Sequence, residues 1–319
     1  MLTGLKLPWE MMVIWKSLGD VAPLLMLIGI GVVLRITRIV DDDSRMVLTR
    51  VGYYVTIPVA ILTSIAKAQL TPSMLFLPLI GLALPVTLSG VIYLCTPGLA
   101  QQRATRGTML IAMVGLVVFG YPFAQIFYGD AGLARMAMYD VGNVLYISTA
   151  AWWLAQSYGK RGRQGILVSL LAILKSPFIW AALIGVTIAI FKLPLAGPIG
   201  NLLDRLAAAN TPVVMIAVGT FLRPKLAQGR LVGLVVLVRM ILGGLMGWLA
   251  ALLLGLRGLD IVIVTLAATL PVGTTPLIYS STEGLDPELA ASIILTTVVI
   301  GAVIVNILPH LLAGVYLAK

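Results

Sequence analysis

The hydrophobic positions of this chain are gathered into long, nearly uninterrupted runs. A helix that spans a lipid bilayer needs about 20 mostly apolar residues, and ten runs of roughly this kind follow one another along the sequence. They lie near residues 18–37, 46–66, 72–95, 107–129, 133–157, 177–192, 198–221, 231–255, 259–283 and 288–313. The pattern predicts an all-α integral membrane protein with ten transmembrane helices.

The stretches between these runs divide the chain into four parts. Residues 1–17 mix tryptophan and lysine with aliphatic residues, which favours a segment lying in the membrane interface over a cleaved leader. Residues 18–157 hold the first five runs and residues 177–319 the second five. Between them, residues 158–176 are expected to form a basic cytoplasmic loop and an interfacial helix.

Composition agrees with a lipid environment and excludes several kinds of site. Hydrophobic residues make up 60% of the 319 positions and charged residues 11%, where a soluble domain has about 25% charged residues. Cys95 and His310 are the only residues of their types, so we expect no disulfide framework, no metal site and no cofactor. The sequence also lacks a nucleotide-binding loop or a nucleophile–base pair, and we expect no enzymatic activity.

The net charge of +10 reflects membrane topology and not nucleic-acid binding, because the basic residues lie in short loops. The loops after the first, third, fifth and seventh runs contain twelve Lys and Arg residues, and eight lie on the opposite side of the membrane. Lys175 and Arg239 are assigned to neither side. The positive-inside rule then places both termini outside the cytoplasm of an inner (plasma) membrane.

The two halves of the chain resemble each other. The segment "YYVTIPVAILTSI" of the second run matches "AANTPVVMIAVGT" of the seventh, each with an interior proline. Similarly, "YPFAQIFYGDAGLARMA" parallels "TPLIYSSTEGLDPELAA". Because each half has an odd number of spans, the second copy must insert upside down, which predicts a 5+5 inverted repeat.

Two runs carry residues that interrupt a helix. Gly120 and Pro122 lie within the fourth run, and Pro271, Gly273 and Pro276 lie within the ninth. Proline lacks an N–H and clashes with the preceding turn, so we expect breaks near Gly120–Pro122 and Pro271–Pro276. Simple proline kinks are the alternative, but broken helices at matching positions of two repeats are a sequence sign of a transporter's binding site.

The predicted breaks also suggest the charge of the ligand. In an inverted repeat, helices four and nine run in opposite directions and cross near the midplane. The half-helices that begin at Pro122 and Pro276 would direct their positive N-terminal ends to the crossing point. A negatively charged substrate suits such a site.

These segments resemble the auxin efflux carrier family, within the larger group that includes the bile acid:sodium symporters. The likeness rests on "LLMLIGIGVVLRITRIVDDDS", "YYVTIPVAILTS", the "GYP" of the fourth run with "YGDAGLARMAMYDVGN", and "DPELAASIILTT", and it covers roughly residues 18–316. The resemblance implies ten helices in a 5+5 inverted repeat, crossed helices four and nine, and secondary transport of organic anions. A homodimer is an expectation from the resemblance alone.

The chain departs from the family pattern N-x-G-F-x-G-x-P before the first break. Gly115 and Val117 stand where the family has Asn and Gly, and Thr275 stands where the second break often has Asn. The amide contacts implied by the resemblance are thus missing, so auxin or malate does not follow as the substrate.

Two ionisable residues fall inside predicted spans. Asp140 lies about seven residues into the fifth run, with Asn143 on the same helix face. A carboxylate at lipid depth marks an ion or proton path by default; the alternative is a structural pair with Arg135. Arg239 lies within the eighth run and is either a countercharge for the substrate or a partner for Asp140.

Donor groups cluster near both predicted breaks, although hydroxyls in membrane helices often only bond their own backbone. The predicted substrate-binding residues are Gly120, Tyr121, Pro122, Gln125, Arg239, Thr274, Thr275, Pro276 and Tyr279. Asp140 and Asn143 are the predicted coupling residues.

We therefore expect a secondary transporter that moves a small organic anion by elevator-like alternating access, coupled to protons or uncoupled. The polar residues near the breaks are mainly hydroxyls, which disfavours sodium, although a sodium-coupled symporter remains an alternative. A membrane-embedded sensor of the same fold is another.

Overall fold

The computed structural model describes residues 22–23, 26–67, 71–98, 102–159, 177–221 and 228–316. Apart from one isolated bridge, these residues form helices and loops without a strand. The predicted interfacial segment 1–17 and most of the loop 158–176 lie outside the described residues.

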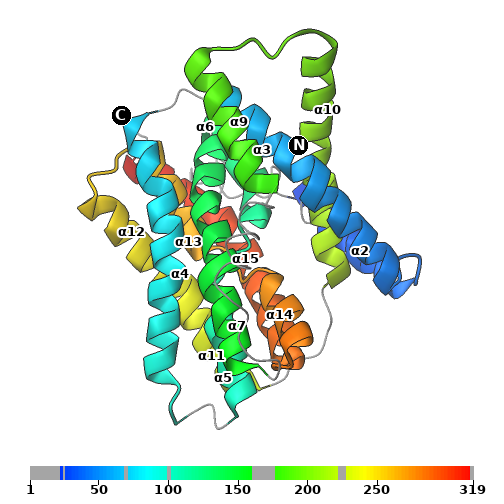
Figure 1. Cartoon of the computed structure of the whole chain (residues 1–319), viewed down its shortest axis with the longest axis vertical. Coiled ribbons are helices and arrows are strands. Elements are labelled where there is room, and N and C mark those ends of the chain that lie inside the picture. Colours follow the sequence, from blue (N-terminus) through cyan, green and yellow to red (C-terminus); the bar gives the residue numbers. More distant parts are fainter. Residues whose placement is uncertain are drawn as a thin grey trace, which may run out of the picture.

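The helices form two bundles that share a long boundary. The smaller bundle contains residues 26–36, the continuous rod α2–η1–α3, and two helices beyond the basic loop. Its elements are α2 (Asp42–Val51), η1 (Gly52–Thr56), α3 (Ile57–Lys67), α9 (Pro177–Phe191) and α10 (Gly197–Phe221). Figure 1 shows α2 and α10 on the right of the molecule, with α3 and α9 beside them.

The larger bundle contains the rest of the described chain. Its first half comprises η2 (Pro72–Leu75), α4 (Phe76–Cys95), α5 (Arg103–Ile111), α6 (Val117–Tyr146), η3 (Ile147–Ala151) and α7 (Trp152–Tyr158). Its second half comprises α11 (Gly229–Val236), η4 (Leu237–Leu242), α12 (Gly243–Leu253), α13 (Leu259–Thr269), α14 (Thr275–Glu283) and α15 (Pro287–Tyr316). Helices α4, α12 and α13 lie on the left of Figure 1, opposite α2 and α10.

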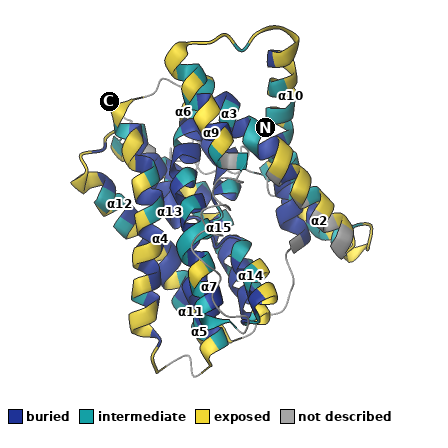
Figure 2. Cartoon of the chain, in the orientation of Figure 1, coloured by how far each residue is buried: buried dark blue, intermediate teal, exposed yellow. Residues whose placement is uncertain are grey.

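The outer surface is apolar where a soluble protein would be polar. On α4, Leu79 is 60% exposed and Leu94 75% exposed, and on α12 Leu253 is 79% exposed. Figure 2 shows exposed residues along the outer faces of α2, α4 and α10. Because the exposed faces of α4 and α12 carry large aliphatic side chains, we expect lipid to surround them.

Four helical segments of the described chain are long and apolar enough to cross a bilayer. They are Pro72–Cys95, Gly197–Thr220, Gly229–Leu253 and Pro287–Tyr316. Shorter apolar helices lie at Met26–Ile36, Tyr54–Lys67, Ile179–Phe191 and Leu259–Thr269. The chain is thus a multi-pass helical membrane protein, and the count of ten spans and the inverted repeat stay predictions.

The fourth predicted span is interrupted, but not at the expected residues. Helix α5 ends at Ile111 and α6 begins at Val117, so the extended backbone lies between residues 112 and 116. Gly120, Tyr121 and Pro122 lie inside α6, and the prediction of a break there was wrong. Gly129, whose φ of 62° is favourable only for glycine, ends the first straight part of α6 and turns the chain into the next helix.

The ninth predicted span is interrupted where the prolines predicted it. Helix α13 ends at Thr269 and α14 begins at Thr275, which places Pro276 in the first turn of α14. Proline is tolerated there because the first N–H groups of a helix have no intrahelical acceptor.

The two interruptions meet and satisfy each other's backbone. Gly115 and Val272 form an isolated antiparallel bridge. The N–H of Leu116 donates to the carbonyl of Pro271 at 2.7 Å, and the N–H of Gly273 donates to the carbonyl of Val114 at 3.1 Å. Non-helical backbone at membrane depth requires such partners, and they are available to residues 114–116, not to residues 120–122. This availability sets the position of the first break.

Candidate functional site

A cavity of about 150 Å³ lies at the boundary between the two bundles, beside the crossing of the broken helices. The larger bundle contributes both interruptions and one face of the second part of α6, and the smaller bundle contributes η1 and its neighbours with the last turns of α10. The residues that line it are Leu48, Gly52, Ile57, Gly115, Leu116, Val117, Val118, Asp140, Asn143, Val144, Ile147, Val213, Val214, Ala217, Val218, Gly273, Thr274 and Thr275.

The two walls of the cavity differ in chemistry. The wall from the smaller bundle is aliphatic, with Val213, Val214 and Val218 from α10. The wall from the larger bundle carries the polar side chains Asp140, Asn143, Thr274 and Thr275. A ligand held here would therefore turn its polar group toward the larger bundle.

The positive ends of two half-helices open on this cavity. Leu116 and Val117 stand at the start of α6, and Thr274 and Thr275 stand at the start of α14. The first N–H groups of a helix lack intrahelical partners and carry a partial positive charge. Two such ends beside one cavity form an anion-attracting arrangement.

Asp140 is buried, with 3% of its surface exposed, and its carboxylate accepts two side-chain hydrogen bonds. The Tyr121 hydroxyl donates to Oδ2 at 2.7 Å, and Nδ2 of Asn143 donates to Oδ1 at 3.0 Å. Of the two ion pairs in the described chain, Lys67–Asp204 and Arg135–Asp260, neither includes Asp140. The carboxylate thus stands in the cavity wall with neutral donors around it.

Asn143 links Asp140 to the first interruption. Its Oδ1 accepts the N–H of Gly115 at 3.1 Å, and its Nδ2 donates to the carbonyl of Gly115 at 3.1 Å. The side-chain amide of Asn143, in the second part of α6, therefore binds the extended backbone at Gly115. This is the position at which the family pattern has Asn.

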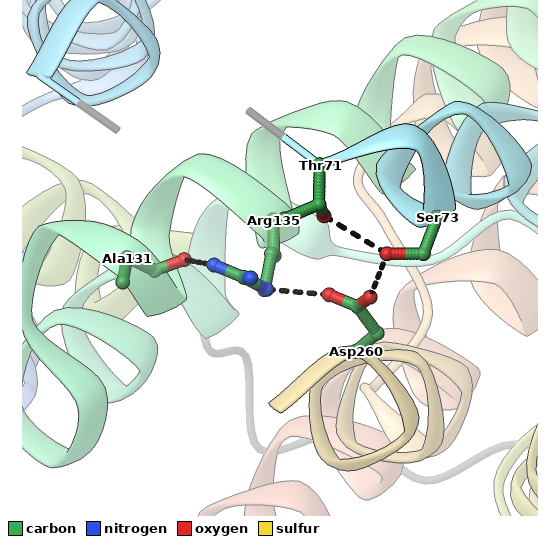
Figure 3. Close-up of polar contacts among 5 residues, drawn as sticks. All are labelled: Thr71, Ser73, Ala131, Arg135 and Asp260. Atoms are coloured by element: carbon green, nitrogen blue, oxygen red, sulfur yellow. Dashed lines mark hydrogen bonds and ion pairs between the residues drawn. The ribbon is translucent and has the colours of Figure 1, made fainter. Parts of the chain in front are cut away.

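Arg135 and Asp260 form an ion pair outside the cavity. The two side chains are 13% and 8% exposed, and Nε of Arg135 lies 2.5 Å from Oδ1 of Asp260. The Ser73 hydroxyl, which is also bonded to Thr71, donates to the other carboxylate oxygen. Figure 3 shows this cluster joining η2, the second part of α6 and the start of α13. Arg135 therefore neutralises Asp260 and not Asp140.

A second polar cluster fixes the opposite end of the crossing helices. Asp286 caps α15, because its Oδ1 accepts the N–H of Leu289 at 3.0 Å. Its other oxygen accepts the Thr105 hydroxyl at 3.2 Å, and its own N–H donates to Thr108 at 3.0 Å. These contacts tie α5 to the turn between α14 and α15.

The remaining predicted site residues are dispersed around the crossing. Gly120 packs against Leu270, since a Cβ at Gly120 would lie 2.6 Å from Cδ1 of Leu270. Tyr279 donates to the carbonyl of Ile147 at 3.3 Å and packs edge-on against Trp152. Gln125 is exposed on α6, and Pro122 and Pro276 are buried in their helices. None of these five residues lines the cavity.

Arg239 is buried in η4, with 2% of its surface exposed, and it does not line the cavity. Its Nη1 donates to the carbonyl of Ala268 at 2.7 Å. No carboxylate of the described residues forms an ion pair with it, so the structure does not pair it with Asp140.

The aliphatic wall had no recognisable signal in the sequence. Valines of α10 look like those of any lipid-facing helix, and only the packing of α10 against the larger bundle turns them toward a ligand. Gly115 was noticeable in the sequence, because the family pattern has Asn at this position. It was interpreted as a departure from the pattern and was not predicted to line the binding site.

Comparisons with known proteins agree with this architecture. Residues 17–309 match the family described as membrane transport protein. An uncharacterized transporter of Methanothermobacter thermautotrophicus is 29% identical over 303 residues, which cover 92% of this chain and 97% of that protein. An uncharacterized transporter of Methanocaldococcus jannaschii is 25% identical over 292 residues, covering 86% of this chain and 91% of that protein.

The broken, crossing helices, the apolar exterior and the matched family lead to one identification, and they confirm the likeness read from the motifs. This chain belongs to the membrane transport protein family, the group of auxin efflux carrier-like transporters.

Proposed function

We propose that this protein is a secondary transporter that carries a small organic anion across the membrane by alternating access. The observation that supports it most is the cavity between the two bundles, at which two half-helix N-termini and a buried carboxylate meet. A site at the crossing of broken helices, between two groups of helices, is the usual position for a transported substrate.

The preference for an anion follows from the helix ends. The positive N-terminal ends of α6 and α14 lie at the cavity, and the Thr274 and Thr275 hydroxyls add neutral donors. In partly buried sites a helix end stabilises an opposite charge by up to about 2 kcal/mol. A carboxylate should therefore bind more tightly than its neutral amide.

The size and lining of the cavity favour a substrate with a short apolar body. A cavity of about 150 Å³ is comparable to one that takes up benzene. The carboxylate of such a ligand would face the helix ends, and its hydrocarbon part would face Val213, Val214 and Val218 of the smaller bundle. Apolar contact contributes about 25 cal/mol for each Å² removed from water.

Asp140 gives a physical reason for proton coupling. An ionised Asp140 in the cavity wall would repel an anionic substrate by roughly 3 kcal/mol, for charges about 5 Å apart in an effective dielectric of about 20. A protonated Asp140 would not, so the anion and the proton favour each other's binding. Uncoupled transport follows instead if Asp140 keeps one charge state through the cycle.

Movement of one bundle against the other would provide alternating access. The larger bundle holds both interruptions and all polar groups of the cavity, and the two polar clusters at Asp260 and Asp286 tie its helices together. At the cavity the smaller bundle presents aliphatic side chains, among them Val213, Val214 and Val218, and a smooth apolar wall of this kind suits sliding of the larger bundle over it.

Counterflow in proteoliposomes tests transport against the alternative of a ligand sensor. Purified protein would first be screened by thermal shift with 2-oxopentanoate, 2-oxoglutarate and the amide of 2-oxopentanoate, with and without sodium. Vesicles loaded with unlabelled binder should then take up labelled binder transiently, in the absence of sodium. A ligand that stabilises the protein but shows no exchange would identify a sensor, and a strict requirement for sodium would contradict the coupling proposed here.

A further inference from the structure

Arg239 holds a full positive charge inside the larger bundle. A guanidinium remains protonated in proteins, and this one is 2% exposed. Its Nη1 binds the carbonyl of Ala268 at 2.7 Å, in the last turn of α13, where carbonyls lack helical partners. Its Nε is buried without a hydrogen-bond partner in the described chain. The contacts thus leave the positive charge without a negative partner.

The guanidinium lies directly behind the cavity wall. A Cβ on Gly115 would collide with Nη2 of Arg239, and Gly115 itself lines the cavity. Because residue 115 is a glycine, the guanidinium of Arg239 can pack directly against the backbone of the first interruption. Only this backbone segment then separates the positive charge from the cavity. The same backbone segment is held by Asn143, which also binds Asp140.

Two of the buried charged side chains of the larger bundle lie at the crossing of the interrupted helices. The buried charged side chains of the described residues are Asp140, Arg239, Asp260 and Glu283. Asp260 is neutralised by Arg135, and Glu283 is the last residue of α14, away from the crossing. Asp140 and Arg239 remain at the crossing, close to the cavity but not joined as an ion pair.

We infer that Arg239 is a fixed countercharge that sets the stoichiometry at one proton for each monovalent anion and makes transport electroneutral. This inference rests on the proposed function. In the empty carrier, ionised Asp140 and Arg239 sum to zero. In the loaded carrier, Asp140 is protonated, and the bound anion and Arg239 again sum to zero. A net charge at lipid depth is costly, so these two neutral states are the ones that cross the membrane.

The same charge count selects the substrate class. A dicarboxylate would leave the loaded carrier with one uncompensated negative charge even when Asp140 is protonated. Monocarboxylates with a short apolar body are therefore the substrates, and dicarboxylates are poor ones. The pair 2-oxopentanoate and 2-oxoglutarate tests this, because the two ions share a five-carbon 2-oxo acid skeleton and differ by one carboxylate.

The experiment measures uptake of both ions into proteoliposomes under an inward proton gradient. Potassium gradients with valinomycin set the membrane potential to inside-negative, zero or inside-positive, and an internal pH dye counts protons. For the wild-type protein we expect 2-oxopentanoate uptake with one proton per anion and a change of less than about twofold between potentials. Uptake of 2-oxoglutarate should be at least about tenfold slower.

Variants of Arg239 separate its charge from its packing. Arg239→Met removes the charge, so the loaded and the empty carrier both cross the membrane with one negative charge. The rate of uptake should then change several-fold between inside-negative and inside-positive potentials, in place of the insensitivity expected for the wild type. Arg239→Lys retains the charge and should remain insensitive to the potential. Arg230→Met, an exposed position in α11, serves as the matched control and should behave like the wild type.

The wild-type measurements keep the inference testable if Arg239→Met does not fold. Wild-type uptake of 2-oxopentanoate that follows the potential, or a ratio other than one proton per anion, would overturn the inference while leaving a working transporter. Equal uptake of 2-oxoglutarate would do the same. Absence of exchange for every ion tested would reject the proposed function itself, and with it the countercharge.

Discussion

At the scale of single residues, the proposed proton coupling rests on Asp140. Its carboxylate is buried, binds Tyr121 and Asn143, and lines the cavity. Asp140→Asn imitates the protonated form and keeps the side-chain size. We expect substrate exchange to continue in this variant, because the loaded state is preserved, while uptake driven by a pH gradient falls to the level without a gradient.

Counterflow and pH-driven uptake of 2-oxopentanoate in the same proteoliposomes would measure both effects. Asp204→Asn is the control, since Asp204 pairs with Lys67 on an exposed part of the smaller bundle. A variant at Asp140 that still responds fully to the pH gradient would remove this residue from the coupling mechanism.

Gly115 is the residue that allows the guanidinium of Arg239 to reach the crossing. In Gly115→Ala the new methyl group would lie 2.3 Å from Nη2 of Arg239, so the buried guanidinium must shift. Overpacking of a buried site costs about 1–3 kcal/mol, and we expect lower thermal stability together with slower exchange.

Gly90→Ala is the matched control, because a Cβ at Gly90 on α4 meets nothing within 4 Å. Unfolding temperatures in detergent and counterflow rates would be compared for both variants. If Gly115→Ala is as stable and as active as Gly90→Ala, then the close packing of Arg239 against Gly115 is not required for stability or transport.

At the scale of elements, the cluster in Figure 3 holds three helices of the larger bundle at one end. Arg135 on α6 binds Asp260 on α13, and Asp260 also accepts from Ser73 on η2. Removing one partner of a buried ion pair leaves the other charge unpaired, at a cost of about 3 kcal/mol. Arg135→Gln should therefore lower the unfolding temperature measurably.

A double-mutant cycle separates the ion pair from its surroundings. Asp260→Asn and Arg135→Gln should each lower the free energy of unfolding. The decrease in the double variant should be smaller than the sum of the two single decreases. Strict additivity would mean that the pair contributes no coupling energy. Lys67→Gln, in the exposed pair with Asp204, should have an effect below about 1 kcal/mol.

The helical class and the second interruption could be predicted from the sequence, because run length and proline position act locally. The first interruption could not be placed in this way. Pro122 suggested a break at residues 120–122, but Gly115 and Leu116 form it, since only there do Pro271, Val272 and Gly273 provide backbone partners. That pairing depends on how two distant helices cross, which a local pattern does not encode.

The candidate site was predictable to a similar extent. Asp140, Asn143, Thr274 and Thr275 were expected from their chemistry and do line the cavity. The hydrophobic half of the cavity was not expected, because Val213 and its neighbours on α10 differ in no way from lipid-facing residues until the two bundles pack together. A polar residue in an apolar run is conspicuous, whereas an apolar residue in the same run is not.

At the scale of the whole molecule, the cavity belongs to both bundles but its polar groups belong to one. Alternating access by movement of the larger bundle makes an asymmetric prediction about accessibility. Thr274 travels with the larger bundle, so a cysteine there should meet water on each side of the membrane in turn. Val213 lies on α10 of the smaller bundle, and a cysteine there should be reachable from one side.

Single-cysteine variants, made in a Cys95→Ser background, test this with a membrane-impermeant thiol reagent applied to one side of oriented vesicles. During exchange, Thr274→Cys should be labelled from either side, and addition of 2-oxopentanoate should slow its labelling because the ligand covers it. Val213→Cys should be labelled from one side under every condition, and Asp204→Cys, at an exposed position, reports vesicle orientation. Labelling of both Thr274→Cys and Val213→Cys from the same single side would mean that the larger bundle does not cross the membrane with its ligand, and the carrier mechanism would have to be replaced by a fixed binding site.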